Sequence, residues 1–229
     1  MLMRNLTINT TGRMPLAARF LSRLKAIIIF LMFFSAIFVH GSENGRDVFT
    51  FRADRMSGGM ATGREITVLM GNAEVQSNNL LLRADRIEIH GSDNRFIDCI
   101  GNVSGYDEER EIFFITDRLR YDRTLGIARL EGNSTLEDRR NELVARARFI
   151  EYDEENEIAI LQISVRLFKD NLVCRSEHAL YNRGEQFLEL SGFPLVYKND
   201  DEFQADRIRV DLETDDVFME GDVRGSLRN

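Results

Sequence analysis

The sequence has 229 residues, and its 30 Lys and Arg residues against 38 Asp and Glu residues give a formal net charge of −8. An acidic chain lacks the basic face that a phosphate backbone needs, so nucleic acid is not an expected partner. The two cysteines are too few for a disulfide framework. Cys99 and Cys174 lie in apolar, strand-like runs where buried free thiols are common, and one bridge between them is the alternative.

Residues 1–41 contain basic residues, no acidic residue, and an apolar run from Ala26 to Val39. A membrane-spanning helix needs about 20 apolar residues, so this shorter run predicts a signal peptide over residues 1–41. We expect cleavage before Ser42, which leaves an exported, periplasmic chain of residues 42–229 forming one domain. Met14 is an alternative start, and retention of the apolar run as an anchor is the alternative to cleavage.

A motif of the form Ala-Asp-Arg-apolar-x-apolar recurs through the exported part. Its equivalent polar positions are 54, 85, 117, 148, 177 and 206, a period of about 30 residues of the kind that marks a repeat architecture. Between these copies lies a second motif, apolar-x-Gly-(Asn/Asp)-x-x-apolar, as in residues 69–75, 99–103, 130–134 and 219–223. Both motifs alternate with period 2 and are separated by acidic turns, so they predict strands and no helices after residue 45.

The alternation changes phase inside each repeat. Leu82 and Ala84 share one face, Ile87 and Ile89 share the other, and the change falls at Asp85-Arg86. A strand can change its buried face only at a bulge or corner, so we expect bent strands that form two layers. We interpret the recurring Asp-Arg pairs as ladders of ion pairs between copies, with phosphate binding as the alternative.

Stacking the copies places like residues in apolar columns. The four predicted columns are Ile87, Leu119, Ile150, Ala179 and Ile208; Ile89, Tyr121, Tyr152, Tyr181 and Val210; Ile97, Ala128, Ala159, Leu188 and Val217; and Cys99, Leu130, Leu161, Leu190 and Met219. The end segments, about 47–56 and 207–224, would be strands with an open edge.

The repeated Ala-Asp-Arg and Gly-Asn motifs behind a signal segment resemble those of the OstA/LptA family of periplasmic lipopolysaccharide-transport proteins, over about residues 48–225. Arg148 and Glu177 stand where other copies have Asp, and Ile163 and Phe193 interrupt the Gly-Asn signature. The resemblance implies an all-β, elongated and twisted β-jelly roll with open ends. It also implies partnership with inner-membrane LptC-type and outer-membrane LptD-type proteins, and end-to-end homo-oligomers.

By this resemblance the chain would carry the acyl chains of lipopolysaccharide, or of a similar glycolipid, toward the outer membrane. The implied lipid-contacting lining is Ile87, Ile89, Ile97, Leu119, Tyr121, Leu130, Ile150, Tyr152, Leu161, Leu190, Ile208 and Met219. Two alternatives stay open: a structural or adhesive β-solenoid with a filled core, and an anchored LptC-type component.

We expect no enzyme, cofactor or metal site. His90 and His178 occupy non-equivalent repeat positions, and no Cys and His cluster has zinc spacing. Nucleophile, phosphate-loop and dinucleotide motifs are also missing from the sequence.

Overall fold

The computed structural model describes residues 49–59 and 65–228. The expectations for residues 1–41, for cleavage before Ser42 and for a start at Met14 lie outside the described residues. Residues 47–229 form one compact unit, and its described part is a single sheet of sixteen strands joined by turns and one short 3₁₀ turn. The predicted all-β fold is confirmed.

The strands are numbered in chain order. They are β1 (Phe49–Arg52), β2 (Arg55–Gly59), β3 (Ile66–Ser77), β4 (Leu80–His90), β5 (Phe96–Asp107), β6 (Ile112–Asp122), β7 (Ile127–Asp138), β8 (Leu143–Asp153), β9 (Ile158–Lys169), β10 (Leu172–Asn182), β11 (Phe187–Ser191), β12 (Leu195–Lys198), β13 (Asp201–Gln204), β14 (Arg207–Asp211), β15 (Val217–Glu220) and β16 (Arg224–Ser226), with the 3₁₀ turn η1 (Ser92–Asn94) after β4.

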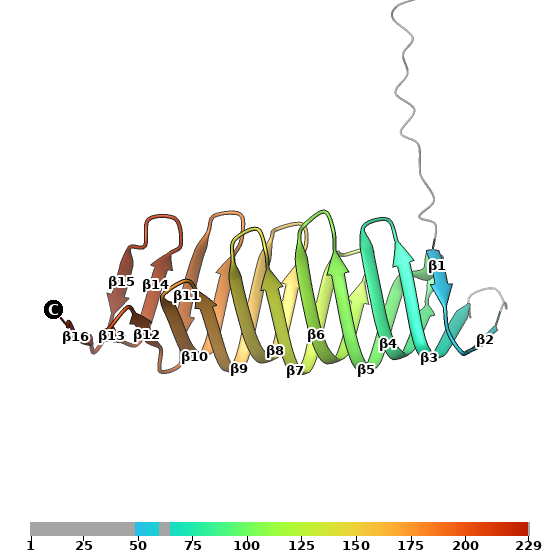
Figure 1. Ribbon diagram of the computed structural model, residues 1–229, viewed down its shortest axis with the longest axis horizontal. Helices are drawn as coiled ribbons and strands as arrows, with labels where there is room; N and C mark the ends of the chain where they lie inside the picture. The colour runs from blue at the N-terminus through green and yellow to red at the C-terminus, as the bar shows by residue number, and fades with distance from the viewer. Residues whose placement is uncertain (1–48, 60–64, 229) are drawn as a thin grey trace, which may run out of the picture. The chain divides into compact units, whose positions relative to one another are not determined.

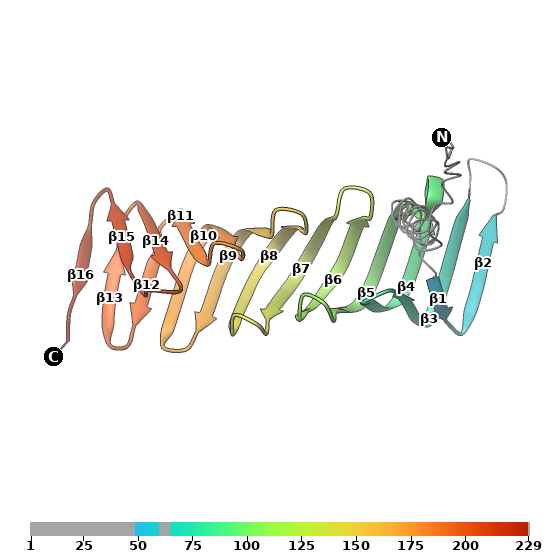
Figure 2. The same ribbon diagram turned by 90° about the horizontal axis from the view of Figure 1, so that it is seen from above.

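From β3 to β10 each strand pairs antiparallel with the next one in sequence, so the sheet is a long meander (Figure 1). After β10 the sheet divides, because one half of β10 pairs with β11 and the other half with β12. Within this unit β1 and β2 lie at one end, and β15 and β16 lie at the other (Figure 2). Each of these four strands has one paired neighbour among the described residues, so the open edges predicted for both end segments are confirmed.

Each long strand bends at its middle, where the pairing register shifts. The shift falls between Arg83 and Arg86 in the β4–β5 pair, and between Met70 and Ala73 in the β3–β4 pair. The predicted change of buried face at Asp85-Arg86 is therefore confirmed as a recurrent β-bulge. This line of bulges, here called the corner, folds the sheet into two layers.

We name the layers by their residues. The first layer contains β2, β11, β14, β15 and residues 66–70, 86–90, 96–100, 118–122, 127–131, 149–153, 158–162 and 178–182; the second contains β1, β12, β13, β16 and residues 73–77, 80–83, 103–107, 112–115, 134–138, 143–146, 165–169 and 172–175.

The corner explains why Asp and Gly-Asn recur half a repeat apart. Gly101 has φ +78°, and a Cβ added there would overlap the carboxylate of Asp85, which crosses over it from the neighbouring strand. The next residue, Asn102, donates its side-chain Nδ2 to Asp85 Oδ2 at 2.9 Å. Glycine is needed here both for its left-handed backbone and for its lack of a side chain.

The same Asp and Asn bond joins Asp54 to Asn72 and Asp117 to Asn133. The interpretation of the Asp-Arg motif as ion-pair ladders is therefore wrong for these aspartates, which accept from asparagine at the bulge. Arginine does form cross-strand pairs one position later, as in Arg118 with Glu131 at 3.9 Å. The two residues of the motif thus have separate partners, because neighbours along a strand face different ways.

The predicted columns merge in pairs in the first layer. One row runs across successive strands as Leu69, Ile87, Cys99, Leu119, Leu130, Ile150, Leu161, Ala179, Leu190, Ile208 and Met219, and the next as Ile89, Ile97, Tyr121, Ala128, Tyr152, Ala159, Tyr181, Leu188, Val210 and Val217. Residues from both motifs alternate in each row, since the two halves of a repeat are neighbouring strands. Cys99 and Cys174 are buried free thiols, as expected.

Candidate functional site

The predicted lining residues lie together on the inner face of the first layer. Ten of the twelve are buried, and Tyr121 and Met219 are partly buried against the same apolar cluster. The structure therefore brings all twelve into the space between the layers.

The opposite wall of this interior was not among the predicted lining residues. It is formed by inward side chains of the second layer, which are Val75, Leu82, Phe114, Leu136, Ala145, Leu167, Cys174 and Val196. These residues belong to one buried cluster with the first-layer rows. The sequence does contain a signal for this wall, because Leu82 and Phe114 alternate with polar residues just before the change of phase. The alternation shows which residues share a face of a strand, but it does not show that the inner faces of the two layers pack against each other.

The layers join covalently along the corner and meet only through side chains on the opposite side, here called the seam. The turns at 91–95, 123–126, 154–157, 183–186 and 212–216 end the first layer, and those at 78–79, 108–111, 139–142, 170–171 and 199–200 end the second. No strand pairing crosses the seam within residues 49–59 and 65–228. A sheet folded in this way can open along the seam without losing a hydrogen bond between two backbone groups.

A buried polar cluster closes the middle of the seam. Arg183, from a first-layer turn, donates from Nε to Asp138 Oδ2 of the second layer at 2.8 Å, and from Nη1 to Glu157 at 2.6 Å. Its Nη2 donates to the carbonyl of Arg110 at 2.9 Å. Burial lowers the pKa of the Arg183 guanidinium, but the hydrogen bond and charge of Asp138, together with Tyr152 and Glu157, more than offset this, and the net pKa is raised. We call this cluster the latch.

Three tyrosines stand on alternate strands beside the latch, in the register Tyr121, Ala128, Tyr152, Ala159, Tyr181. Tyr121 donates to Glu154 at 3.0 Å, and Tyr181 donates to Asp138 at 2.8 Å. The buried hydroxyl of Tyr152 has no hydrogen-bond partner within the described residues. Desolvation raises the pKa of Tyr152 to about 12, so this hydroxyl stays protonated at neutral pH and can donate.

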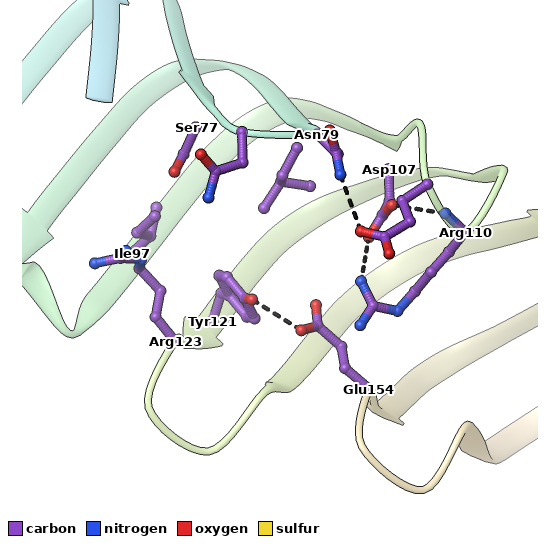
Figure 3. Close-up of a pocket in the computed structure, with 11 residues that line it drawn as sticks. Ser77, Asn79, Ile97, Asp107, Arg110, Tyr121, Arg123 and Glu154 are labelled. Atoms are coloured by element: carbon purple, nitrogen blue, oxygen red, sulfur yellow. Dashed lines mark hydrogen bonds and ion pairs between the residues drawn. The ribbon is translucent and has the colours of Figure 1, made fainter. Parts of the chain in front are cut away.

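A cleft of about 220 Å³ opens into the seam next to Tyr121 (Figure 3). Leu80 and Ile97 supply apolar walls from the two layers, while Arg110 and Glu154 face each other at its rim (Figure 3). Arg110 is held by Asp107 at 2.8 Å, and burial raises the pKa of Glu154 above its ordinary value. The cleft thus leads from charged turns at the surface to Ile97 and Tyr121 of the apolar interior.

The remaining chemistry of the described residues is sparse. No group of three or more His, Cys, Asp or Glu side chains within them could hold a metal ion. In residues 49–59 and 65–228 the structure has no helix that is long and apolar enough to span a membrane. The site is therefore an apolar interior with a polar seam.

Comparisons with known proteins bear on the family. Residues 46–187 match the family described as OstA-like protein. A crystal structure of LptH, the LptA homologous periplasmic component of the lipopolysaccharide transport device of Pseudomonas aeruginosa, is 8% identical, with a TM-score of 0.26, over 80% of this chain and 96% of that chain. No curated protein matches the sequence. Because the family match covers more than half of the chain, the protein belongs to the OstA-like family.

Proposed function

We propose that this protein is a periplasmic lipid carrier that holds the acyl chains of lipopolysaccharide, or of a similar multi-acyl glycolipid, between its two layers and passes them toward the outer membrane. The observation that carries the proposal is the apolar interior, which runs unbroken from Leu69 to Met219 across eleven paired strand segments. Family membership supports it independently.

The physical need for such an interior is simple. Each buried CH₂ group gains about 0.8 kcal/mol, so a lipid with several acyl chains cannot cross water unshielded. An apolar wall repeated at every strand offers the same contact at each step, which suits movement along the sheet. A carrier of this kind needs binding and release but no covalent chemistry.

Access would be through the seam. The cleft at Leu80 and Ile97 is one place where the apolar interior meets solvent, and its charged rim would keep a polar head group outside. The Tyr152 hydroxyl, which has no partner within the described residues, supports the same view, since an ester, amide or hydroxyl oxygen near the head of a lipid could accept a hydrogen bond from it. Opening would separate side chains at the latch and leave the sheet intact.

Transfer to other proteins would use the sheet ends. β1 and β2 leave one end of the sheet with unpaired edges, and β15 and β16 leave the other. An open edge can accept a further strand through main-chain hydrogen bonds. We propose that LptC-type and LptD-type partners, or further copies of this chain, pair there, and that residues 1–41 direct the chain to the periplasm.

The proposal can be tested by photo-crosslinking with purified lipopolysaccharide as the probe. We would place p-benzoylphenylalanine at Leu80 and, separately, at Tyr121, both at the cleft. The control position is Leu180, which is a partly exposed apolar residue on the outer face of the same layer as Tyr121. Labelling at the cleft but not at Leu180 is the expected result. Equal labelling at all three positions, or none, would overturn the carrier function.

One observation favours a second candidate, a ligand-free structural solenoid. The central residues Ile87, Ile150 and Leu161 are completely buried by protein alone, as in an ordinary filled core. Lipid extraction and native mass spectrometry of the protein purified from cells separate the two functions. A co-purifying multi-acyl lipid supports the carrier, whereas a lipid-free chain that also fails to bind added lipopolysaccharide supports the solenoid.

A further inference from the structure

The outer face of the second layer carries a row of arginines. Arg146, Arg166 and Arg175 lie directly opposite one another on β8, β9 and β10, and all three are exposed. Side chains at directly opposite positions have their Cβ atoms about 5 Å apart, and like charges there are destabilising. The juxtaposed like charges do not stabilise the fold, so the arrangement calls for another explanation.

These arginines form no ion pair with the described residues. Within the part of the chain that the structure describes, no carboxylate oxygen lies within 4.0 Å of Arg146, Arg166, Arg175 or their neighbour Arg148. The nearby carboxylates already have partners: Glu137 pairs with Arg139, Glu131 with Arg118, and Glu177 accepts from the Ser164 backbone.

The outer face of the first layer is built differently. Several of its arginines form ion pairs, as in Arg129 with Glu151 at 2.6 Å and Arg120 with Asp98 at 3.8 Å. An unneutralised cluster of arginines is conspicuous in a chain whose net charge is −8. The row differs in this from the paired arginines on both layers, such as Arg83 with Glu74 at 2.7 Å, and an anion supplied from outside would provide the missing negative charge.

Aromatic rings lie beside the arginine row. The Arg146 guanidinium lies 5.5 Å from the ring centre of Phe168, and that of Arg175 lies 5.8 Å from that of Tyr197. Both rings are partly exposed. Stacking of this kind holds a guanidinium along the surface while its N–H groups remain free to donate.

Exposed apolar side chains border the row at the corner. Phe193 is 92% exposed and Ile163 is 53% exposed. Both have a positive φ, in positions where other repeats place Gly or Asn. A bulky side chain in this conformation is strained, so these two corners present apolar groups to solvent at some cost in stability.

A shallow groove lies beside the arginine row. It has a volume of about 330 Å³ and is lined by Arg146, Arg148 and Arg166 together with the polar side chains of Asn133 and Ser164. Three guanidinium groups around one depression match the oxygens of a phosphate group, which arginine contacts with two parallel bonds.

We propose that this arginine-rich outer face binds the surface of a bilayer containing anionic phospholipid. The arginines contact lipid phosphates, the rings of Phe168 and Tyr197 lie at the head-group level, and Phe193 and Ile163 enter the apolar boundary. The face is distinct from the interior and does not depend on what the interior holds.

The arrangement fits a membrane better than an acidic protein. In protein–protein interfaces charged residues are depleted from the centre and apolar residues fill it. Here the charged row is central and the most exposed apolar side chains are at the border. Apolar anchors beside a basic patch are instead the pattern of proteins that lie on a membrane surface.

The test is a flotation assay of the full-length gene product as purified from cells, whether or not residues 1–41 have been removed. The vesicles contain phosphatidylcholine alone or phosphatidylcholine mixed with phosphatidylglycerol. We expect binding to the mixed vesicles that weakens with added salt. The triple variant Arg146→Gln, Arg166→Gln and Arg175→Gln should bind about 100-fold more weakly, because each basic residue near an anionic surface contributes about one factor of five. The phosphatidylcholine vesicles report any contribution from residues 26–39.

The matched control is Arg55→Gln, Arg129→Gln and Arg209→Gln, which removes the same charge from exposed positions elsewhere. It should bind nearly as the natural protein does. The variant Phe193→Ser leaves the net charge of the protein unchanged and tests the apolar anchor separately. It should bind the mixed vesicles severalfold more weakly than the natural protein. Equal losses in the two triple variants, equal binding to both vesicle types, or no binding to mixed vesicles would each overturn the proposal, and the last would favour an acidic protein as occupant.

Discussion

Arg183 and Asp138 form an ion pair across the seam, with side chains that are 3% and 0% exposed. The residues are 45 positions apart in sequence, in a turn of the first layer and at the end of β7. Their contact is one of the bonds that hold the two layers closed on the side where no strand pairing does so. The latch therefore sets how readily the interior can open.

Replacing Arg183 with Met should lower the free energy of unfolding by about 3 kcal/mol, because a buried carboxylate then lacks its charged partner. Urea unfolding at pH 7 measures the change. The double variant Arg183→Met, Asp138→Leu should recover much of the loss, since it leaves no buried charge. A double variant as unstable as the single one would contradict this account of the latch.

The tyrosine row predicts that replacing tyrosine with phenylalanine changes stability differently at Tyr181 and at Tyr152. Tyr181→Phe removes a hydrogen bond to a buried carboxylate and should destabilise the fold by about 2 kcal/mol. Tyr152→Phe removes a buried hydroxyl without a described partner and should leave stability unchanged or raise it by up to about 1 kcal/mol. Thermal unfolding of the two variants side by side tests the difference. Equal destabilisation would show that Tyr152 has a partner after all.

The corner predicts a strong effect of a single methyl group. Gly101→Ala should cost about 2 kcal/mol or more, because alanine is strained at φ +78° and its Cβ would displace Asp85. Gly184→Ala is the control, because its φ lies outside the left-handed region and the nearest atom to a new Cβ is Oε2 of Glu157 at 3.3 Å, the carboxylate oxygen that does not accept from Arg183. We expect little change there. Chemical unfolding curves that fail to separate the two variants would rule out the corner as a site of strict glycine requirement.

Glu154 predicts a pH dependence of stability. Burial raises the pKa of its carboxyl above 4.5 in the folded protein, so the folded state holds the proton more tightly than the unfolded state. Its contribution to stability is therefore present below pH 4.5 and is lost as the pH rises through the folded pKa. Glu154→Gln should remove this loss and gain stability relative to the natural protein between pH 4 and pH 7.

The exposed Glu155 lies in the same turn, and Glu155→Gln serves as the control for loss of one negative charge. Unfolding by urea at both pH values gives the comparison. A stability difference between Glu154→Gln and the natural protein that is the same at both pH values would contradict the buried-carboxyl explanation.

The cysteines should be inert in the folded protein. Cys99 and Cys174 are fully buried, so a reagent cannot reach either sulfur atom. Desolvation also raises the pKa of the Cys174 thiol to about 12, so the reactive thiolate does not form at neutral pH. We expect no reaction with a thiol reagent at pH 8 and two reactive thiols per chain after unfolding in guanidinium. Rapid labelling of the folded protein, or a failure to label after unfolding without a reductant, would contradict this.

The repeated part of the fold was predictable from sequence because its signals are local. The alternation around Leu82 and Ile87 and the break at Asp85 lie within a few residues, and they specify both the strand and its bend. Columns such as Leu119 with Ile150 followed from equal spacing alone. Their merging with Cys99 and Leu130 needed the pairing register, which the spacing does not contain.

The latch and the arginine row could not be predicted in the same way. Arg183 and Asp138 occupy non-equivalent places in their repeats, so periodicity gives no reason to join them. The asparagine partners of Asp54, Asp85 and Asp117 were also missed, because ionic pairing with the adjacent arginine was the simpler interpretation. In each case the deciding fact is which side chains a folded sheet brings together across a distance in sequence.

The corner pairing of Asp, Gly and Asn also makes the length of the sheet modular. β5 and β6 with their turns span residues 96–126, and a second copy inserted after Gly126 would set Asp117 against another Gly101 and Asn102. Every strand would still meet a neighbour of the kind it meets now. One added copy lengthens the sheet by two strand spacings, about 10 Å. The span of such a protein can therefore change in fixed steps, by gain or loss of whole repeats, without redesign of either end.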